Sequence, residues 1–221
     1  MHRPWTRDGK FDLKKADWYF DFISPYSYIG FKLLDRFDGR LDIRCRPVLF
    51  AALLDHWENK GPAEIPPKRN WTFRWCTWWA GHLGIPFRMP AAHPFNPLPY
   101  LRLSIAAGNT REAISRIFDA VWTTGNDAAD EQGFLALAKS LDIDPARLAD
   151  QSVKDALRAE TDKAISFGIF GVPTLLVDQE LFWGADAMEF VEAYLADPGI
   201  VATGEMQRAA MLPVGVTRRR N

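Results

Sequence analysis

The chain has 221 residues, of which 48% are hydrophobic and 25% charged, with a formal net charge of −1. This composition is typical of a globular protein that builds one sizeable core or two small lobes. The only basic run, Arg218–Arg220, is expected to be a solvated tail, so no nucleic-acid partner is predicted. No segment approaches the ~20 apolar residues of a membrane span. The basic segment 1–16 lacks the apolar centre of a secretory signal.

Only two cysteines occur, Cys45 and Cys76, and they lie far apart in the sequence. They form neither a redox motif nor a metal-ligand cluster, so we expect no metal and a reducing, cytoplasmic location. Cys45 belongs to the alternating run 41–45, which favours a buried strand thiol over a nucleophile.

The first pattern is a strand that stops at a helix N-cap. Trp18, Phe20 and Phe22 alternate with polar neighbours, which predicts a strand over residues 17–22. Ser24 then precedes Pro25, the usual order of an N-cap and a first helical residue. A hydroxyl beside free backbone N–H groups is suited to holding an anion.

Serines stand at both ends of the four-residue turn Ser24–Ser27. In thioredoxin-like redox proteins this place holds Cys-x-x-Cys. A helix over 25–37, a turn at 38–39 and a strand over 41–48 complete a βαβ unit, whose two strands should be parallel.

A long helical block follows, with no convincing strand between residues 53 and 167. Asn109 is predicted to cap one of its helices, with Glu112 as the partner in a capping box. Residues 85–99 contain five prolines and are expected to be irregular. Helices are predicted over 68–83, 100–107, 111–123, 131–140 and 152–167, with Gly168 ending the last.

Strand character returns at 174–177 and 181–183, which flank a predicted hairpin turn. A last helix is expected over 185–195. The fold class is therefore α/β, a βαβ–ββα core with a large all-helical insertion. The predicted domains are 16–55 with 168–200, an inserted helical domain over 56–167, and terminal extensions 1–15 and 201–221.

Four tryptophans, Trp71, Trp75, Trp78 and Trp79, fall at helical spacing. Such a stripe is usually part of a core, and the alternative is the aromatic wall of a ligand pocket. Val172–Pro173 precedes the predicted hairpin. An X-Pro peptide before a strand is usually trans. Here we expect it to be cis and to lie opposite the first helix, which leaves the backbone of Val172 free to pair with an extended peptide.

The chain resembles kappa-class glutathione transferases, and most closely 2-hydroxychromene-2-carboxylate isomerases of the DsbA-like thioredoxin superfamily. The resemblance covers nearly all of residues 17–197. It is carried by four segments in order: Phe20-Asp21-Phe22-x-Ser24-Pro25-Tyr26-Ser27-Tyr28, 59–68, Phe170-Gly171-Val172-Pro173-Thr174, and Phe182-Trp183-Gly184-x-Asp186.

The resemblance implies a thioredoxin-like fold, a homodimer and glutathione as cofactor. Ser24 would hold the glutathione sulfur, and Val172 would pair with the glutathione backbone. Asp186, with the amides near Ala185, would meet the γ-glutamyl end, and Asn59 matches a glutathione contact. Tyr26 and Pro173 complete the expected glutathione site.

The second-substrate end departs from the family pattern. Lys68 matches the family's lysine, but tryptophans replace a tyrosine, an aspartate and an arginine that usually follow it. Trp71 and Trp75, with Lys68, are the predicted substrate residues. The tryptophans favour a small aromatic substrate. Four arginines, Arg69, Arg74, Arg88 and Arg102, are candidates for binding its carboxylate, although a surface position is the commoner role for each of them.

The free energy needed to ionise the glutathione thiol can be estimated without the family resemblance. Lowering a thiol pKa from ~8.5 to ~6.5 requires about 2.7 kcal/mol. A helix N-terminus supplies roughly 0.3–2 kcal/mol. A hydroxyl that donates to the thiolate adds ~1.5–3 kcal/mol. Ser24, the predicted catalytic residue, is therefore expected to be a donor to the thiolate and not a nucleophile.

These observations favour a glutathione-dependent isomerase that acts on an aromatic substrate such as 2-hydroxychromene-2-carboxylate by reversible thiolate addition. One alternative is a kappa-like transferase or peroxidase that consumes glutathione. Another is a non-catalytic glutathione-binding module, which serines at both thiol positions fit equally well. A disulfide oxidoreductase is disfavoured because neither sulfur is present.

Overall fold

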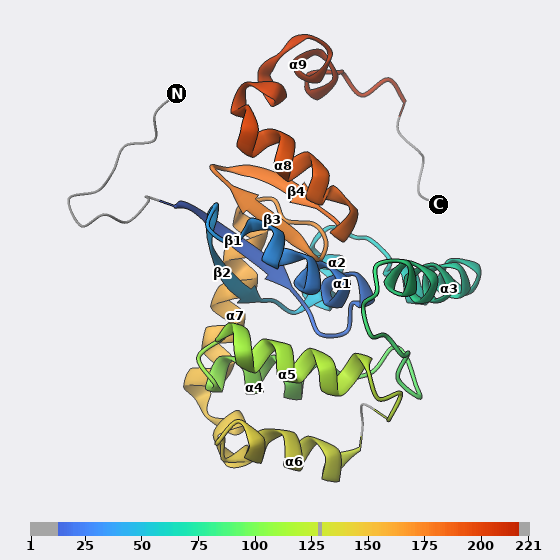
Figure 1. The fold of residues 1–221 in the computed structure, drawn as a ribbon, viewed down its shortest axis with the longest axis vertical. Coiled ribbons are helices and arrows are strands. Elements are labelled where there is room, and N and C mark those ends of the chain that lie inside the picture. The colour runs from blue at the N-terminus through green and yellow to red at the C-terminus, as the bar shows by residue number, and fades with distance from the viewer. Residues whose placement is uncertain (1–12, 128–129, 217–221) are drawn as a thin grey trace, which may run out of the picture. The chain divides into compact units, whose positions relative to one another are not determined.

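The computed structural model describes residues 13–127 and 130–216 (Figure 1). Contacts divide the chain into two units, one ending at Asp186 and the other starting at Ala187. The first unit contains the sheet and the helical insertion. In the second unit, α8 spans Met188–Ala196, a 3-10 turn spans Pro198–Ala202 and α9 spans Gly204–Ala210.

The sheet has four strands in the order β2-β1-β3-β4. β1 (Lys14–Phe20) is parallel to β2 (Leu41–Pro47), and α1 (Pro25–Leu33) connects them. β3 (Thr174–Val177) is antiparallel to both β1 and β4 (Glu180–Trp183). The predicted βαβ–ββα core with a helical insertion is confirmed.

The first strand lies earlier in the chain than predicted. It begins at Lys14, which pairs with Leu41, and it ends at Phe20, which pairs with Pro47. The prediction of a strand over residues 17–22 was wrong at both ends. Asp21 and Phe22 already belong to the turn, because the Asp21 side chain binds backbone N–H groups there.

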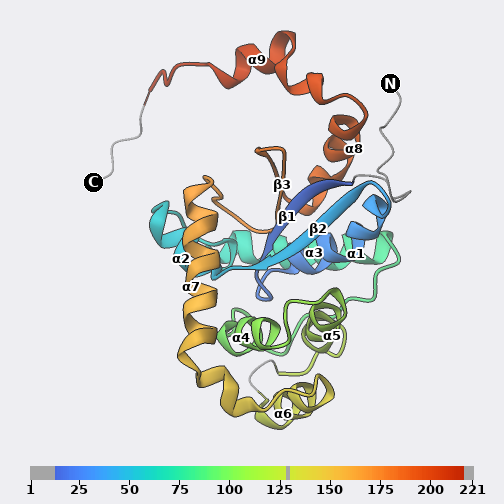
Figure 2. The same ribbon diagram turned by 90° about the vertical axis from the view of Figure 1, so that its left-hand side faces the viewer.

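Helices fill the chain between β2 and β3, and no strand occurs among the described residues of this block (Figure 2). Its first helix, α2, was not predicted, because a helix of only seven residues gives a weak periodic pattern. Its α-helices are α2 (Phe50–His56), α3 (Pro66–His82), α4 (Leu98–Ala106), α5 (Arg111–Trp122), α6 (Glu131–Ser140) and α7 (Gln151–Ser166).

The predicted cap of α5 was wrong by one residue. Thr110 is the N-cap, and its hydroxyl accepts a hydrogen bond from the Ala113 N–H at 3.2 Å. Asn109 instead has a positive φ of 52° and accepts a hydrogen bond from Ser104 through its side chain. Asparagine tolerates this left-handed conformation, which ends α4 and reverses the chain.

The hairpin turn is shorter than predicted. Asp178 and Gln179 form it alone, with φ values of 51° and 75°, and Glu180 already belongs to β4. Two successive residues at positive φ are characteristic of the tight turns that match strand twist.

Two hydrophobic clusters hold the sheet. Trp18 and Phe20 pack with Phe31 of α1 and Phe118 of α5. A second buried cluster joins the sheet to α2, α7 and the loop before β3. It consists of Tyr19, Val48, Leu53, Ala164, Ile169 and Val172. Both clusters meet at the end of β1, so this end is held from two sides.

The last predicted helix begins later than expected. Residues Ala185–Ala187 form a 3-10 turn, and the α-helix starts at Met188. The predicted domain limits stay a prediction. Residues 1–12 and the Arg218–Arg220 tail lie outside the described chain. No helix of the described residues is long and apolar enough to cross a membrane.

Candidate functional site

Ser24 is the N-cap of α1, as predicted. Its backbone is extended, and its Oγ accepts a hydrogen bond from the Ser27 N–H at 3.1 Å. Because the hydroxyl accepts this bond, its own proton is available to a second group. The Ser24 residue is only 7% exposed, and it borders a cavity.

Three carbonyl groups before Ser24 have defined partners. Asp21 O accepts from the Ser24 N–H, Phe22 O from the Trp122 indole and Ile23 O from the His93 ring. Trp122 belongs to α5 and His93 to the proline-rich connection. The helical insertion therefore holds the turn that presents the Ser24 hydroxyl.

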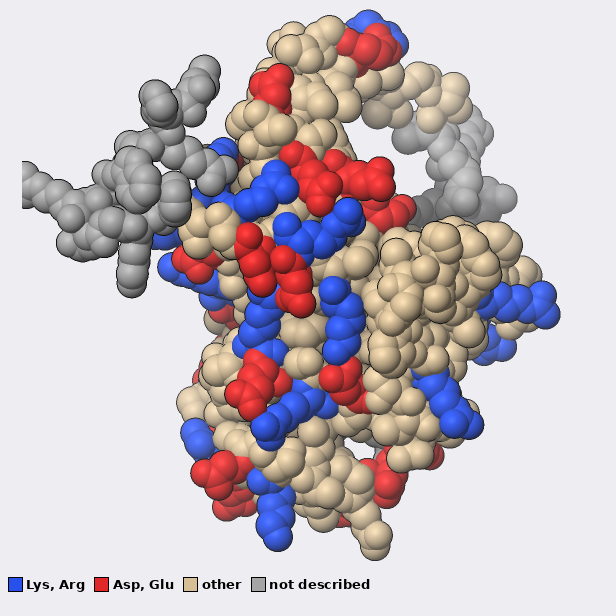
Figure 3. Space-filling view, viewed as in Figure 1, with Lys and Arg blue, Asp and Glu red and all other residues tan. Residues whose placement is uncertain are grey.

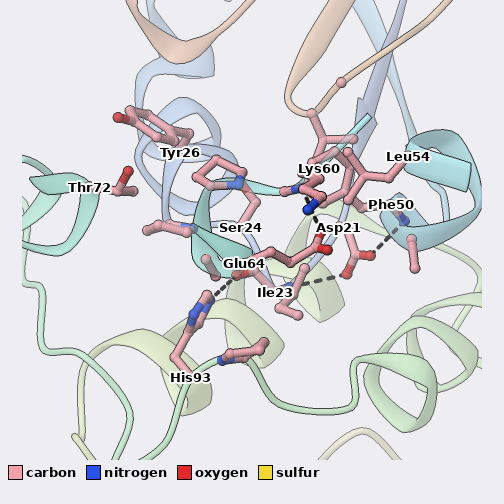
Figure 4. Close-up of a pocket in the computed structure, with 18 of the residues that line it drawn as sticks. Asp21, Ile23, Ser24, Tyr26, Phe50, Leu54, Lys60, Glu64, Thr72 and His93 are labelled. Atoms are coloured by element: carbon pink, nitrogen blue, oxygen red, sulfur yellow. Dashed lines mark hydrogen bonds between the residues drawn. The ribbon is translucent and has the colours of Figure 1, made fainter. Parts of the chain in front are cut away.

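The cavity beside Ser24 has a volume of about 530 Å³ (Figure 4). Its polar groups come from the Ser24 turn, the 59–64 loop, α3 and His93 of the proline-rich connection. Its apolar groups come from α2, α3, the proline-rich connection, the 170–172 loop and β4. A pocket of this size, mostly apolar with a few convergent polar groups, is suited to a small organic ligand.

Asp21 lies at the end of β1, buried on the cavity wall. Its Oδ1 accepts from the Ile23 N–H at 3.1 Å, and its Oδ2 accepts from the Phe50 N–H, the first of α2, at 2.9 Å. Burial raises the pKa of this carboxyl from 3.8 to about 7, against the lowering effect of its backbone hydrogen bonds. Sequence reasoning assigned Asp21 no role, although a polar residue between Phe20 and Phe22 was a usable signal.

His93 also lines the cavity, and nothing in its sequence context indicated this. Its Nε2 lies 2.8 Å from Ile23 O, so in the neutral ring Nε2 carries the proton. Nδ1 is then an acceptor, and it is buried with no partner among the described residues. Burial lowers the pKa of His93, which keeps the ring neutral.

Tyr26 lines the cavity and joins α1 to α3. Its hydroxyl has hydrogen-bond partners in Cys76 and Thr72, both on α3. Burial raises the Tyr26 pKa, and the nearby Cys76 and Asp186 add to this, so the phenol stays protonated. Cys76 is fully buried, which raises its pKa to about 12, and burial raises the pKa of half-buried Cys45 to about 11. Neither thiol is a competent nucleophile.

The loop before β3 lies at the same cavity. Gly171 and Val172 line it, and the Val172–Pro173 peptide is cis, as the sequence analysis expected. Val172 makes no backbone hydrogen bond to the described chain. Pro173 is buried and does not line the cavity. An extended ligand backbone could therefore pair with Val172.

Asn59 and Lys68 both line the cavity, and both are exposed. The Asn59 side chain accepts from the Lys60 N–H at 2.8 Å, which orders the loop. Two neighbours that sequence reasoning did not select, Lys60 and Glu64, also line it. Glu64 accepts from the Gly61 N–H at 2.6 Å, which closes this loop on itself.

The tryptophans of α3 do not line the cavity. Trp71 is 66% exposed, and it stacks on Trp75 with 6.2 Å between ring centroids. Trp78 is 57% exposed. Figure 3 shows an extended uncharged surface over α3. The stripe is neither core nor pocket wall, and the prediction of substrate contacts for Trp71 and Trp75 gains no support.

A different aromatic group borders the cavity. Phe73 of α3 packs edge to face against the His93 ring, with 5.1 Å between the ring centroids. Phe95 packs against His93 in the same way, with 5.9 Å between the centroids. All three line the cavity. We define Phe73, His93 and Phe95 as the aromatic wall. The four arginines proposed for a carboxylate, Arg69, Arg74, Arg88 and Arg102, are not among the lining residues.

The predicted γ-glutamyl contacts also lie outside the lining residues. Ala185 is buried, whereas Asp186 is exposed. The charge of Asp186 nevertheless acts on Tyr26, whose pKa it raises. The predicted role of Asp186 stays a prediction. No group of three or more metal-ligating side chains occurs among the residues described.

Comparisons with known proteins agree with this architecture. Residues 15–196 match the DSBA-like thioredoxin domain family. The chain is 29% identical over 193 residues to 2-hydroxychromene-2-carboxylate isomerase of Sphingobium xenophagum, a match that covers 83% of this chain and 99% of that protein. A second isomerase of this name, from Pseudomonas sp. (strain C18), is 30% identical over 187 residues, covering 80% of this chain and 88% of that one.

Glutathione S-transferase kappa 2 of Caenorhabditis elegans is 29% identical over 209 residues, covering 84% of this chain and 93% of that protein. The solved structure of a 2-hydroxychromene-2-carboxylate isomerase superposes with a TM-score of 0.72 at 23% identity, over 90% of this chain and 100% of that one. The chain belongs to the DSBA-like thioredoxin domain family, within the group that contains 2-hydroxychromene-2-carboxylate isomerases and kappa-class glutathione transferases.

Proposed function

We propose that the protein is a glutathione-dependent isomerase of a small aromatic, carboxylate-bearing substrate such as 2-hydroxychromene-2-carboxylate. The observation that carries this proposal is the Ser24 hydroxyl, which stands at the N-terminus of α1 and on the wall of a cavity of about 530 Å³. The relatives named for isomerase and glutathione transferase activity support an enzyme of this class.

Glutathione would lie along the polar side of the cavity. Its sulfur would accept a hydrogen bond from the Ser24 hydroxyl, and its backbone would pair with Val172. Lys68, Lys60 and Asn59 would meet its carboxylate groups, since ammonium and amide groups are donors for carboxylates. The Ser24 hydroxyl can favour the thiolate by ~1.5–3 kcal/mol, and the α1 N-terminus adds roughly 0.3–2 kcal/mol.

The aromatic substrate would lie against the aromatic wall. The thiolate would add to a conjugated carbon, forming a C–S bond and moving an electron pair to the carbonyl oxygen. Rotation about the resulting single bond then precedes loss of the thiolate, which restores the conjugated system. Glutathione is regenerated and none is consumed.

The test is the ultraviolet change of 2-hydroxychromene-2-carboxylate with and without glutathione. The proposal expects turnover that needs glutathione while the concentration of free thiol stays constant. Equal rates with and without glutathione would refute this assignment for that substrate.

The same experiment separates the alternatives. A kappa-like transferase or peroxidase would lower the free thiol as product forms. A non-catalytic module would bind glutathione in a calorimeter and turn over no electrophile. We favour the enzyme because the cavity has room beyond the Ser24 turn for a second, aromatic ligand.

A further inference from the structure

Asp21 is a fully buried carboxyl that links the Ser24 turn to the start of α2. Its side chain is fully buried, and no Lys or Arg of the described chain forms an ion pair with it. Its two oxygens accept from the backbone N–H groups of Ile23 and Phe50, and the backbone of Phe22 also lowers its pKa. A buried charge without a cation is costly, and such groups concentrate at functional sites.

Asp21 and Ser24 belong to one turn. The Ser24 N–H donates to the Asp21 carbonyl at 3.1 Å, and the Ile23 N–H donates to the Asp21 carboxylate. Both residues line the cavity, and Figure 4 labels both. A carboxylate offers about four lone-pair sites, so the backbone hydrogen bonds from Phe22, Ile23 and Phe50 leave room for a proton.

The other titratable groups of the cavity are poorer proton acceptors. Lys60 and Lys68 are ammonium groups without an acceptor site. Tyr26 is held protonated, and burial lowers the pKa of His93, so a proton added to its buried Nδ1 is disfavoured. Glu64 is exposed, and its carboxylate accepts a hydrogen bond from the Gly61 N–H.

We propose that Asp21 takes up the proton that the glutathione thiol loses when its thiolate forms beside Ser24, and returns it when glutathione leaves. This inference rests on the proposed function. The S–H bond breaks and an O–H bond forms on the Asp21 carboxylate, so one negative charge moves from oxygen to sulfur. The net charge of the site is unchanged, and the proton stays on Asp21 through addition, rotation and elimination.

The electrostatics of the cavity favour this exchange. A fully buried carboxylate and a thiolate at the same cavity repel each other, so formation of one favours protonation of the other. The carboxyl, with a pKa of about 7, is close in acidity to the thiol it would serve, which favours reversible transfer. Ser24 alone cannot fill this role because its hydroxyl donates to the sulfur.

The experiment is calorimetry of glutathione binding to the whole protein at about pH 7.5, where the Asp21 carboxyl is mostly ionised. Titrations in buffers of different ionisation enthalpy give the number of protons released. Ultraviolet absorbance gives the thiolate formed in the same samples. The inference expects thiolate formation with almost no proton released to the buffer. Release of about one proton per thiolate would overturn it.

Variants locate the acceptor. Asp21→Asn is expected to release most of one proton per thiolate, whereas Glu64→Gln, the other cavity carboxylate, is expected to keep the wild-type proton count. Proton release in Glu64→Gln and none in Asp21→Asn would overturn the inference.

If Asp21→Asn does not fold, the number of protons that the wild-type protein releases per thiolate still tests the inference by itself. Absence of glutathione binding would overturn the proposed function and this inference together. Binding as a thiolate with release of the proton overturns the role of Asp21 only.

Discussion

The Ser24 Oγ accepts a hydrogen bond from the Ser27 N–H at 3.1 Å, and this bond makes the two serines of the turn unequal. Ser24 borders the cavity, whereas the Ser27 hydroxyl is buried and has no partner within the described structure. Only Ser24 can meet a ligand, so the pair does not act as a substitute for a Cys-x-x-Cys couple.

Replacement of Ser24 by Ala should raise the thiolate pKa of bound glutathione by about 1–2 units, since the lost hydrogen bond to a charged group contributes ~1.5–3 kcal/mol. An ultraviolet titration of the thiolate measures this. Ser27→Ala is the matched control and should leave the titration unchanged. Equal titrations for wild type and Ser24→Ala would contradict the role of the hydroxyl.

Replacement of Lys68 by Ala should weaken glutathione binding roughly fivefold, and the difference should shrink as salt is added. The reason is that an exposed ammonium contributes ~1 kcal/mol at most and is screened by ions. Calorimetry at low and high salt provides the measurement. Lys139→Ala, an exposed lysine of α6 outside the cavity, should change nothing. A Lys68→Ala variant of wild-type affinity would remove this residue from the site.

Phe73→Ala should raise the KM for the aromatic substrate about tenfold or more, since loss of a buried phenyl contact costs ~1.5–3 kcal/mol. The KM for glutathione should stay near the wild-type value. Trp71→Ala, on the same helix but 66% exposed, should change neither constant. A raised KM for the aromatic substrate in Trp71→Ala, with an unchanged KM in Phe73→Ala, would contradict this expectation and support the substrate role predicted for Trp71.

Asp21 should make the folded state less stable as pH rises. Its pKa is about 7 in the folded protein and 3.8 as an ordinary carboxyl. The folded state therefore binds the extra proton between these values, and the free energy of unfolding falls as pH rises from about 4 to about 7.

The fall due to this group is at most on the order of 4 kcal/mol. Urea unfolding of wild type and Asp21→Asn across this range tests it. The variant should lose less stability than wild type between the two pH values. If the free energy of unfolding changes with pH equally in wild type and Asp21→Asn, burial does not raise the pKa of this carboxyl.

The order of helices and strands could be predicted because local sequence patterns determine where most of them form. The Ser24-Pro25 cap, Gly168 at the end of α7 and the alternating strands depend on neighbouring residues only. The limits of β1 could not be predicted, because its pairing with β2 extends it to Lys14. A partner 27 residues away decides where such a strand ends.

Cavity residues could be predicted from the sequence where they belong to short local motifs. Ser24, Tyr26, Asn59, Lys68 and Val172 all border the cavity, as the predicted motifs indicated. His93 and Phe95 could not be found, because the irregular proline-rich connection gives no period from which to place them. The helical spacing of the tryptophans shows which residues share a face of α3 and not what that face contacts, so the substrate role of Trp71 and Trp75 stays a prediction.

The most direct test of the account is a crystal structure of the protein grown with glutathione. The account predicts glutathione in the cavity, with its sulfur within hydrogen-bond distance of the Ser24 Oγ and its backbone paired with Val172. A cavity without glutathione, or a glutathione whose sulfur lies away from Ser24, would contradict it.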